Sequence, residues 1–594
     1  MPALSEGPLG TRPGRLLDHR RVFSFCIWVT AASLVVVVLR NTQAVTVVAL
    51  ALAAGTAAWL VPPQVSESRG IGYKTIGVLL GISALLFLFV LIAGNRQFGG
   101  YDYSIPIDLA WRQSQGQHVY RDFPCPYPPA YYLIAWYAFA VLGPSWHVFV
   151  VLGALACGVL FFLTGLVLCR LGQPLFRAVL LAGCAQCMTI ALCAFFAHNA
   201  ITSAAGILYV FVAMWLLRSP GAWKCWLSYL LSLVALAGLK PGVAGVLILS
   251  VTAILLSDKK TARTTAILSA GAFALYEAVL AVNGISMLDV LRAYRDMSVR
   301  GLPSFLYLSH GDGEIAAAMV LFILVLGIST FRSMAAGKRH VSRESMLLGA
   351  AALAGTYGIA TDAEAVFVDL ALIVVVFCYF VMSYERDAEP RRRDEGAISP
   401  HVGVNNVRAV AALCGFCLVM GLGLGWERSK VAGIGPFFER APLREVTSVP
   451  FFESLKAGPW FQRILQQMQS IVAANPGRKF FFGTRLEFGY AAFGKPSPRG
   501  LPVWWHPGTS YPLRSEGAIV RRFQESKFDV LIFARNDFTR TPAGIVAVMS
   551  TEYTRDDRYP DLTVFWRVSA AGHDTKTERG SGRGSSPLAP AEGQ

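Results

Sequence analysis

The sequence predicts an α-helical polytopic membrane protein that ends in a small exported α/β domain. Hydrophobic residues make up 54% of the 594-residue chain and charged residues only 15%, whereas an ordinary soluble domain carries about 25% charged residues. The apolar residues come in uncharged runs of roughly 17–20 residues, the length that a helix needs to cross about 30 Å of hydrocarbon. These runs stop near residue 425, after which Pro, Gly and charged residues return.

We assign about thirteen of the apolar runs as transmembrane helices. The first has Arg20 and Arg21 before it, Arg40 after it and no small-residue cleavage site, so we expect a retained helix rather than a signal peptide. The predicted crossings are 22–39, 44–61, 75–93, 147–169, 177–196, 199–217, 225–239, 242–257, 264–282, 315–331, 345–360, 364–383 and 407–425.

Lys and Arg separate between alternate loops, and this separation predicts the orientation. Short cytoplasmic loops carry an excess of these residues. The loops at 170–177, 218–224 and 332–343 belong to the basic set, whereas the two longest connections, 94–146 and 283–314, belong to the other. We therefore expect a multi-pass protein of the inner (plasma) membrane with a cytoplasmic N-terminus and an extracytoplasmic C-terminus. Because this topology accounts for the net charge of +16, nucleic acid is not an expected partner.

The chain divides into four predicted regions. Residues 1–74 hold an N-terminal tail and two helices, and residues 75–425 hold the transmembrane core with its two large exported loops. Residues 426–571 alternate β-like and helical stretches and predict the α/β domain. Residues 572–594 lack apolar side chains to bury and predict a disordered tail. Within the third region the strands are expected at 479–482 and 528–533, and the helices at 515–527 and 542–552.

The first large loop concentrates carboxylates at one membrane surface. Asp108 lies four residues before Arg112, so a helical ion pair accounts for it. Asp102 has no such local partner, and it directly follows a transmembrane helix and the pair Gly99-Gly100. At this position a side chain can be aimed into a cleft at the membrane surface. Residues 130–142 are apolar but too short to span, so we place them as a helix on the exported surface.

Two stretches resemble a known enzyme family. Asp102, then Gly116, Tyr120 and Tyr127-Pro128-Pro129 resemble the first extracytoplasmic loop of the GT-C glycosyltransferases, multi-spanning enzymes that use a polyprenyl-phosphate sugar as donor. His198-Asn199 and Gly238-Leu239-Lys240-Pro241 are similar to the Gln-Asn and Lys-Pro segments of its mannosyltransferase branch, glycosyltransferase family 87. His198 stands where that branch usually shows Gln. The resemblance covers roughly residues 95–260.

The resemblance implies a GT-C-like core and an inverting hexosyl transfer, of mannose in that branch, from the lipid carrier to a glycan or lipid acceptor outside the cell. It also implies that Asp102 is the catalytic base, since a sugar hydroxyl attacks poorly until a positioned carboxylate takes its proton. Asp122 is the second candidate, and three interpretations stay open for it: it positions the acceptor, it is a weak ligand for a divalent metal, or it forms an ordinary ion pair with Arg121 or Arg112. No metal-ligand cluster and no cofactor motif is predicted.

Cations for the donor phosphate lie on the same predicted side. Lys240 precedes Pro241 at a turn between two helices, where it binds the phosphate or only reaches toward the interface. Arg292 and Arg295 are three residues apart and share a helical face that could grip a lipid phosphate, unless they simply pair with Asp289 and Asp296 on a solvated helix.

Three more residues complete the predicted substrate site. His198 and Asn199 form a polar cluster at the exported end of a helix hairpin, although a capping role explains Asn199 equally well. Tyr127 begins the Tyr-Pro-Pro turn.

The competing hypotheses are a secondary transporter and a non-catalytic assembly protein of the cell envelope. A transporter should place ionisable residues near the middle of its spans and repeat its halves. Glu277 is the one carboxylate that we find well inside a predicted helix, and the long loops are unrelated.

Overall fold

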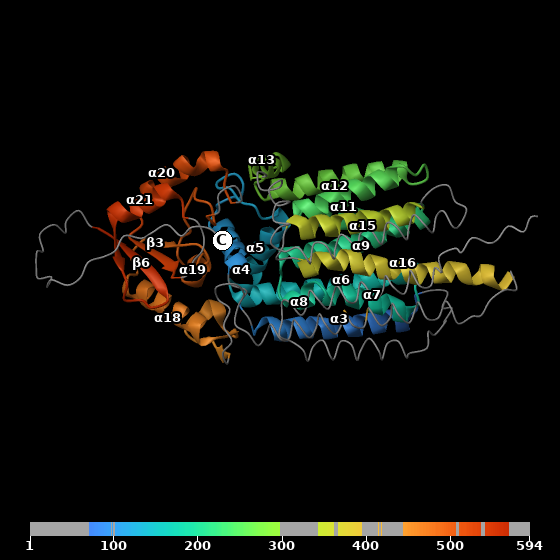
Figure 1. Ribbon diagram of the computed structural model, residues 1–594, viewed down its shortest axis with the longest axis horizontal. Helices are drawn as coiled ribbons and strands as arrows, with labels where there is room; N and C mark the ends of the chain where they lie inside the picture. The colour runs from blue at the N-terminus through green and yellow to red at the C-terminus, as the bar shows by residue number, and fades with distance from the viewer. Residues whose placement is uncertain are drawn as a thin grey trace, which may run out of the picture.

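The computed structural model describes residues 71–96, 98, 101–297, 342–361, 366–394, 414, 417, 443–505, 510–535 and 541–568. In it a bundle of long helices and a C-terminal part, residues 443–568, lie on opposite sides of the short helices α4 (Tyr101–Ser114) and α5 (Pro129–Leu142) (Figure 1). The predicted crossings at 22–39, 44–61 and 315–331, most of 407–425, and the tail from 572 lie outside the described residues. The number of crossings therefore stays a prediction.

The bundle is built from apolar helices that also expose apolar side chains on the outside. Leu85 of α3 and Phe273 of α12 are 66% and 60% exposed, which suits a surface that faces lipid rather than water. In the described chain, five stretches are long and apolar enough to cross a membrane: α3, α6, α7 with α8, α9 and α12. The helices of the bundle are α3 (Tyr73–Gly94), α6 (Trp146–Arg170), α7 (Leu175–Cys187), α8 (Ile190–Cys193), α9 (His198–Arg218), α10 (Trp223–Ala237), α11 (Pro241–Leu256), α12 (Ala262–Val282), α15 (Arg343–Thr361) and α16 (Val366–Asp394).

Helix α9 forms the centre of the bundle. It packs against α6, α10, α11, α15 and α16, and its residues Ala200–Met214 are buried without interruption. The run predicted as one crossing at 177–196 is broken after Cys187, where the Thr189 hydroxyl donates to the carbonyl of Ala185 (2.7 Å) and Ala194 takes a left-handed conformation (φ 59°). A hydroxyl that bonds back to the preceding turn bends a helix. The chain then leads through Phe195 and Phe196 to the start of α9.

The two ends of the bundle differ in charge. At one end Arg218 forms a bidentate ion pair with Glu344 (2.7 and 2.8 Å), and Arg343 pairs with Asp258 (3.3 Å). This end carries the basic loops from which the cytoplasmic side is predicted. We call the other end, which faces the C-terminal part and includes α4, α5 and the loop 115–128, the junction. It is here that α9 and α11 begin and α10 and α12 end (Figure 1).

The C-terminal part contains a four-stranded mixed sheet in the order β3-β4-β6-β5. β3 (Phe480–Phe482) runs parallel to β4 (Val530–Ala534), and β6 (Leu562–Arg567) is antiparallel to both β4 and β5 (Tyr553–Asp556). Both β3 and β4 are buried along their whole length. Helices α20 (Glu516–Ser526) and α21 (Ala543–Glu552) lie on one side of the sheet and α18 (Pro459–Ala474) on the other (Figure 1). The short helix α19 (Phe488–Ala492) packs on α4.

Three helices shape the junction: α4 (Tyr101–Ser114), α5 (Pro129–Leu142) and α13 (Met287–Met297). The N–H of Ala130 in α5 donates to the carbonyl of Gly238 (3.0 Å), and a Cβ added to Gly238 would lie 2.8 Å from that of Ala130. Only glycine permits this approach. The apolar stretch 130–142 is thus a separate short helix docked on the turn between α10 and α11, rather than a crossing.

Candidate active site at the junction

The predicted base, Asp102, lies in the first turn of α4, and its side chain is outside the described residues. The next residue fixes where this turn sits. The Tyr103 ring packs edge-on against Phe195, with ring centroids 4.2 Å apart, and also touches Trp146 of α6. The start of α4 therefore lies over the segment that leads into α9, close to His198 in sequence.

Aromatic rings join the loop to the start of α9. The Tyr127 ring lies 5.0 Å from the His198 ring, the Tyr131 ring lies 5.4 Å from it, and the Tyr131 hydroxyl donates to the carbonyl of Phe196 (2.8 Å). The Tyr120 hydroxyl donates to the carbonyl of Tyr127. Two of the predicted substrate residues, Tyr127 and His198, are thus in direct contact although 71 positions separate them in the sequence.

The turn that carries Lys240 joins the same cluster. The Thr202 hydroxyl donates to the carbonyl of His198 (2.7 Å) and accepts from the backbone N–H of Lys240 (3.2 Å). Asn199 lies in the first turn of α9, and the N-cap residue of that helix is Ala197 rather than Asn199. Lys240 itself is the N-cap residue of α11 and is half-buried. The first turn of α9 therefore holds the predicted donor-binding lysine beside His198.

A buried carboxylate that sequence reasoning did not single out lies next to this turn. Asp369, in the first turn of α16, is 1% exposed and accepts a hydrogen bond from Ser203 (2.6 Å). A Cβ on Gly358 would lie 2.3 Å from the Asp369 carboxylate, so a glycine makes room for it. The available signal was an acidic residue inside an apolar run, which favours a functional site. Glu277, by contrast, has a structural role, because it accepts the N–H of Met287 at the start of α13 (2.8 Å).

Asp122 is tied to its own loop. Its carboxylate accepts the backbone N–H of His118 (2.7 Å) and pairs with Arg121 (3.2 Å). Partial burial works to raise the pKa of Asp122, but these hydrogen bonds outweigh it and leave the pKa below its usual value. A carboxylate stabilised in its charged form is a weaker base. Of the interpretations open for Asp122, the ion pair with Arg121 is present in the structure. The lowered pKa favours a role in positioning the acceptor over proton abstraction.

Helix α13 presents its two arginines differently. Arg295 pairs with Asp296 (3.0 Å), which also pairs with Arg514 of the C-terminal part (2.6 Å). Asp289 instead forms a capping box with Ser286, whose hydroxyl donates to it (2.7 Å). Arg292 is exposed and makes no ion pair within the described chain. Of the two, Arg292 is the cation left available to a lipid phosphate.

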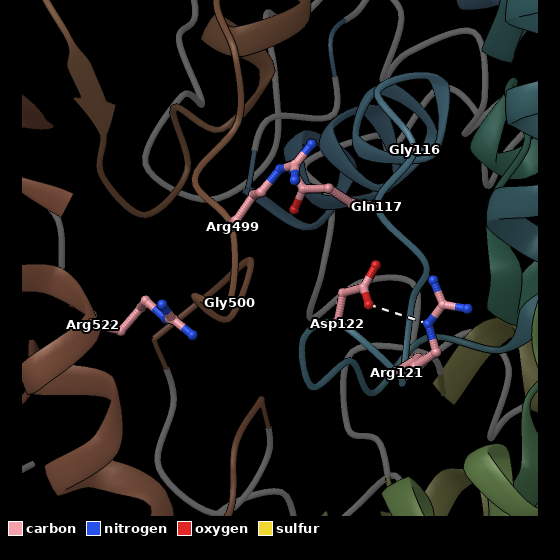
Figure 2. A pocket seen from close by; sticks show the side chains of 7 residues that line it. All are labelled: Gly116, Gln117, Arg121, Asp122, Arg499, Gly500 and Arg522. Carbon is pink, nitrogen blue, oxygen red and sulfur yellow. Dashed lines mark hydrogen bonds and ion pairs between the residues drawn. The ribbon is translucent and has the colours of Figure 1, made fainter. Parts of the chain in front are cut away.

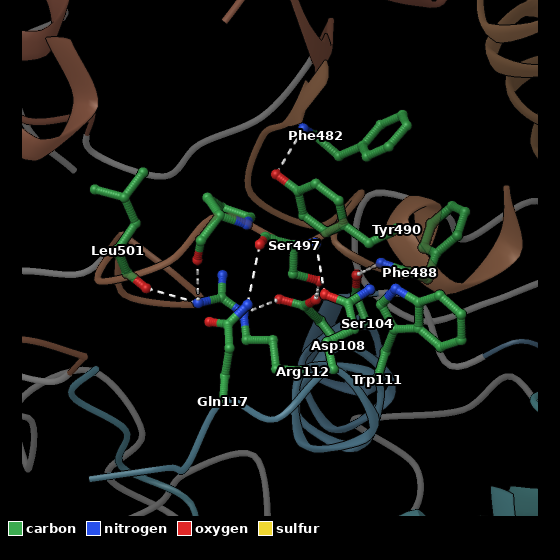
Figure 3. A network of polar contacts seen from close by, with 12 residues as sticks. Ser104, Asp108, Trp111, Arg112, Gln117, Phe482, Phe488, Tyr490, Ser497 and Leu501 are labelled. Carbon is green, nitrogen blue, oxygen red and sulfur yellow. Dashed lines mark hydrogen bonds and ion pairs between the residues drawn. The ribbon is translucent and has the colours of Figure 1, made fainter. Parts of the chain in front are cut away.

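A buried polar network fastens α4 to the C-terminal part (Figure 3). Arg112 Nε donates to Asp108 (2.8 Å), and its Nη1 donates to the carbonyls of Pro498 (2.9 Å) and Leu501 (2.8 Å). The Ser497 hydroxyl donates to the second oxygen of Asp108 (2.5 Å). The ion pair expected between Asp108 and Arg112 is confirmed, and both side chains are buried. Both residues also form hydrogen bonds to residues nearly 400 positions further along the chain. Their partners in the C-terminal part carry no signal in the sequence.

A second buried carboxylate, Glu487, lies beside this network. It is 2% exposed, it precedes α19, and the next residue, Phe488, donates its N–H to the Ser104 hydroxyl of α4 (2.9 Å). Burial raises the pKa of Glu487 to about 8, and the nearby Asp108 adds to the rise. Glu487 is thus largely protonated at neutral pH.

The described residues also form a polar cavity of about 460 Å³ between the loop and the C-terminal part (Figure 2). Its lining residues are Gly116, Gln117, Arg121, Asp122, Arg499, Gly500 and Arg522. Of the predicted site residues whose side chains the structure describes, only Asp122 lines it. No group of three or more His, Cys, Asp or Glu side chains arranged to hold a metal ion occurs in the described part of the chain.

Solved structures similar to this chain include two of ArnT from Cupriavidus metallidurans, one bound to undecaprenyl phosphate (TM-score 0.38) and one in the apo state (TM-score 0.39). In each, 10% of residues are identical over 83% of this chain and 98% of the other. A third is the archaeal oligosaccharyltransferase AglB from Archaeoglobus fulgidus in complex with an inhibitory peptide and a dolichol-phosphate, with 11% identity, coverage of 79% and 70%, and a TM-score of 0.46. No protein-family model and no curated protein matches the chain.

Proposed function

We propose that this membrane protein transfers a sugar from a polyprenyl-phosphate carrier to a glycan or lipid acceptor at the junction. The observation that carries the proposal is the gathering of separate motifs at one end of an apolar bundle. The first turn of α4, the ring pair of Tyr127 and His198, and the turn that holds Lys240 converge there. A lipid-linked donor requires such a place, where a polar site opens beside a surface that can contact hydrocarbon.

The proposed reaction needs one base and a cation. Asp102 takes the proton of the acceptor hydroxyl as its oxygen attacks the anomeric carbon. The bond from that carbon to the phosphate oxygen breaks, and the lipid phosphate leaves with the electron pair. Lys240 and Arg292 stabilise the charge that grows on the phosphate. A single displacement inverts the anomeric centre, and we propose a hexose as the sugar, with mannose first among those to test.

Replacement of the proposed base tests the reaction. Asp102→Asn keeps the size of the side chain but cannot accept a proton, so the rate of transfer should fall by about 10²–10⁴-fold. The measurement is transfer from radiolabelled polyprenyl-phosphate sugars by purified protein, with the yield and melting temperature of the variant as controls. A near-normal rate would remove Asp102 from the mechanism and make Asp122 the next candidate. If neither carboxylate mattered, the transporter hypothesis would replace this one.

Lys240→Ala tests the donor site. Loss of the cation should weaken use of the lipid-linked donor more than use of the acceptor, because it raises the energy of the departing phosphate. Lys224→Ala removes an equal charge at the opposite end of α10 and should leave both unchanged. Equal effects of Lys240→Ala on donor and acceptor kinetics would mean that Lys240 only anchors the turn before α11.

A further inference from the structure

We propose that the cavity between the loop 116–122 and the C-terminal part binds an acidic sugar, one that carries a carboxylate or a phosphate group. The proposal rests on the proposed function, in which an acceptor saccharide reaches this end of the protein, and it names the class of that acceptor. Residues from both sides of the junction line the cavity (Figure 2).

Three guanidinium groups face the cavity. Arg499 makes no ion pair within the described residues, whereas Arg121 pairs with Asp122 (3.2 Å) and Arg522 with Glu525 (3.4 Å). Both of these arginines are more than half exposed, and exposed pairs hold their partners weakly. The planar guanidinium fork fits a carboxylate or a phosphate with two parallel hydrogen bonds. The cavity therefore offers an anion one unpaired cation and two that can exchange partners.

The backbone on one wall adds donors. Arg112 draws the carbonyls of Pro498 and Leu501 toward itself. In a trans peptide the N–H points opposite to the carbonyl, so the N–H of Arg499 points away from Arg112. Within the described chain the N–H groups of Arg499 and Gly500 donate no hydrogen bond. Gly500 has a left-handed φ of 73°, and a Cβ there would lie 2.9 Å from Arg522 Nε, so a larger residue would displace that arginine.

An acceptor on the facing wall distinguishes a sugar from a bare anion. The Asp122 carboxylate is 35% exposed, so it offers acceptor positions to hydroxyl groups and would repel a simple anion. Gln117 is 2% exposed, and its Nε2 donates to the carbonyl of Ser497 (3.0 Å), which fixes this wall against the C-terminal part.

The size of the cavity suits this ligand. Its volume of about 460 Å³ lies within the range of about 300–1,000 Å³ that is usual for small-molecule sites. Cations, backbone donors and a carboxylate acceptor within one cavity match a molecule that carries an acid and several hydroxyl groups.

Binding to the purified full-length protein in detergent tests the proposal without any need for transfer. The probes are trigalacturonate, its methyl ester, glucose 6-phosphate and inorganic phosphate, each titrated by calorimetry. The cavity variants are Arg499→Ala and Arg522→Ala. The matched control is Arg521→Ala, which removes an exposed arginine from the neighbouring position of α20 that does not line the cavity.

We expect trigalacturonate, glucose 6-phosphate or both to bind, and each cavity variant to weaken that binding about tenfold, the value of one charge-assisted hydrogen bond. Arg521→Ala should leave it unchanged. The proposal is overturned if the methyl ester binds as well as trigalacturonate, if only inorganic phosphate binds, or if the cavity variants behave like Arg521→Ala. The binding assay contains no sugar donor, so its result does not depend on the glycosyl-transfer assay. If transfer failed, cavity-dependent binding of the acidic sugar could still be observed. If the protein transferred sugar but showed no such binding, this inference would be overturned and the proposed function would stand.

Discussion

Replacement of Arg112 should release the C-terminal part from α4. Arg112→Met removes the three hydrogen bonds that Arg112 donates to Asp108, Pro498 and Leu501. It also leaves the Asp108 carboxylate, which is 0% exposed, without its cation. Loss of one member of a buried ion pair costs roughly 3–5 kcal/mol. We therefore expect a large fall in the stability of the C-terminal part.

The double variant sharpens this prediction. Asp108→Leu with Arg112→Met removes both charges, and well-packed apolar residues can replace a buried ion pair at little cost. The double variant should therefore be more stable than Arg112→Met alone, and the two single effects should not add. Arg478→Met is the matched control, because Arg478 pairs with Asp529 in an exposed position of the same part of the chain and should cost about 0–1 kcal/mol.

Thermal unfolding of purified protein in detergent, followed by tryptophan fluorescence, measures these effects, since Trp505 is buried in the C-terminal part. The wild type and Arg478→Met should have the same, highest melting temperature, the double variant a lower one, and Arg112→Met the lowest. If Arg112→Met melted with Arg478→Met, or if the double variant lost the sum of both single effects, the buried pair would not hold the junction together.

Three further predictions concern other parts of the chain. Burial raises the pKa of Glu487 from 4.5 to about 8, so the folded state keeps a proton that the unfolded state releases, and stability should fall as pH rises between these values and level off above about 8. The melting temperature of Glu487→Gln should lack this fall with pH, whereas that of the exposed Glu525→Gln should keep it. Identical pH profiles of the two variants would contradict the assignment. Gly238→Val should destabilise the protein more than Gly221→Val, since a Cβ at Gly238 meets Ala130 whereas one at Gly221 meets nothing; equal melting temperatures would refute the close approach. A periplasmic-type reporter should be active when fused after residue 430 and inactive at 262, and the reverse pattern would place Asp102 on the cytoplasmic side.

Local sequence patterns predicted most of the individual elements. Apolar runs of spanning length indicated α3, α6, α9 and α12, because every buried backbone group in lipid must be satisfied within its own helix. The four-residue spacing of Asp108 and Arg112 indicated their ion pair. The runs at 479–482 and 528–533 are where β3 and β4 lie. In contrast, the break after Cys187 was not predicted, since nothing in the apolar run distinguishes the Thr189 hydroxyl that bends it.

The candidate site divides in the same way. Motifs predicted that Tyr127, His198 and Lys240 belong to the substrate site. That these residues lie together depends on how α9 and the turn before α11 pack. Asp108 was expected to be a simple helical pair, and its burial under Ser497 makes it part of the junction instead.

The sequence by itself determined that the chain forms apolar helices with a distinct C-terminal region, and which residue types could carry the chemistry. The spacing of hydrophobic residues and the length of the apolar runs suffice to predict these elements, because both are properties of residues that are neighbours in the sequence. Only the tertiary structure decided that Arg499, Gly500 and Arg522 face Gln117 and Asp122 across one cavity. Contacts between residues nearly 400 positions apart depend on the packing of whole elements, and no local pattern in the chain encodes that packing.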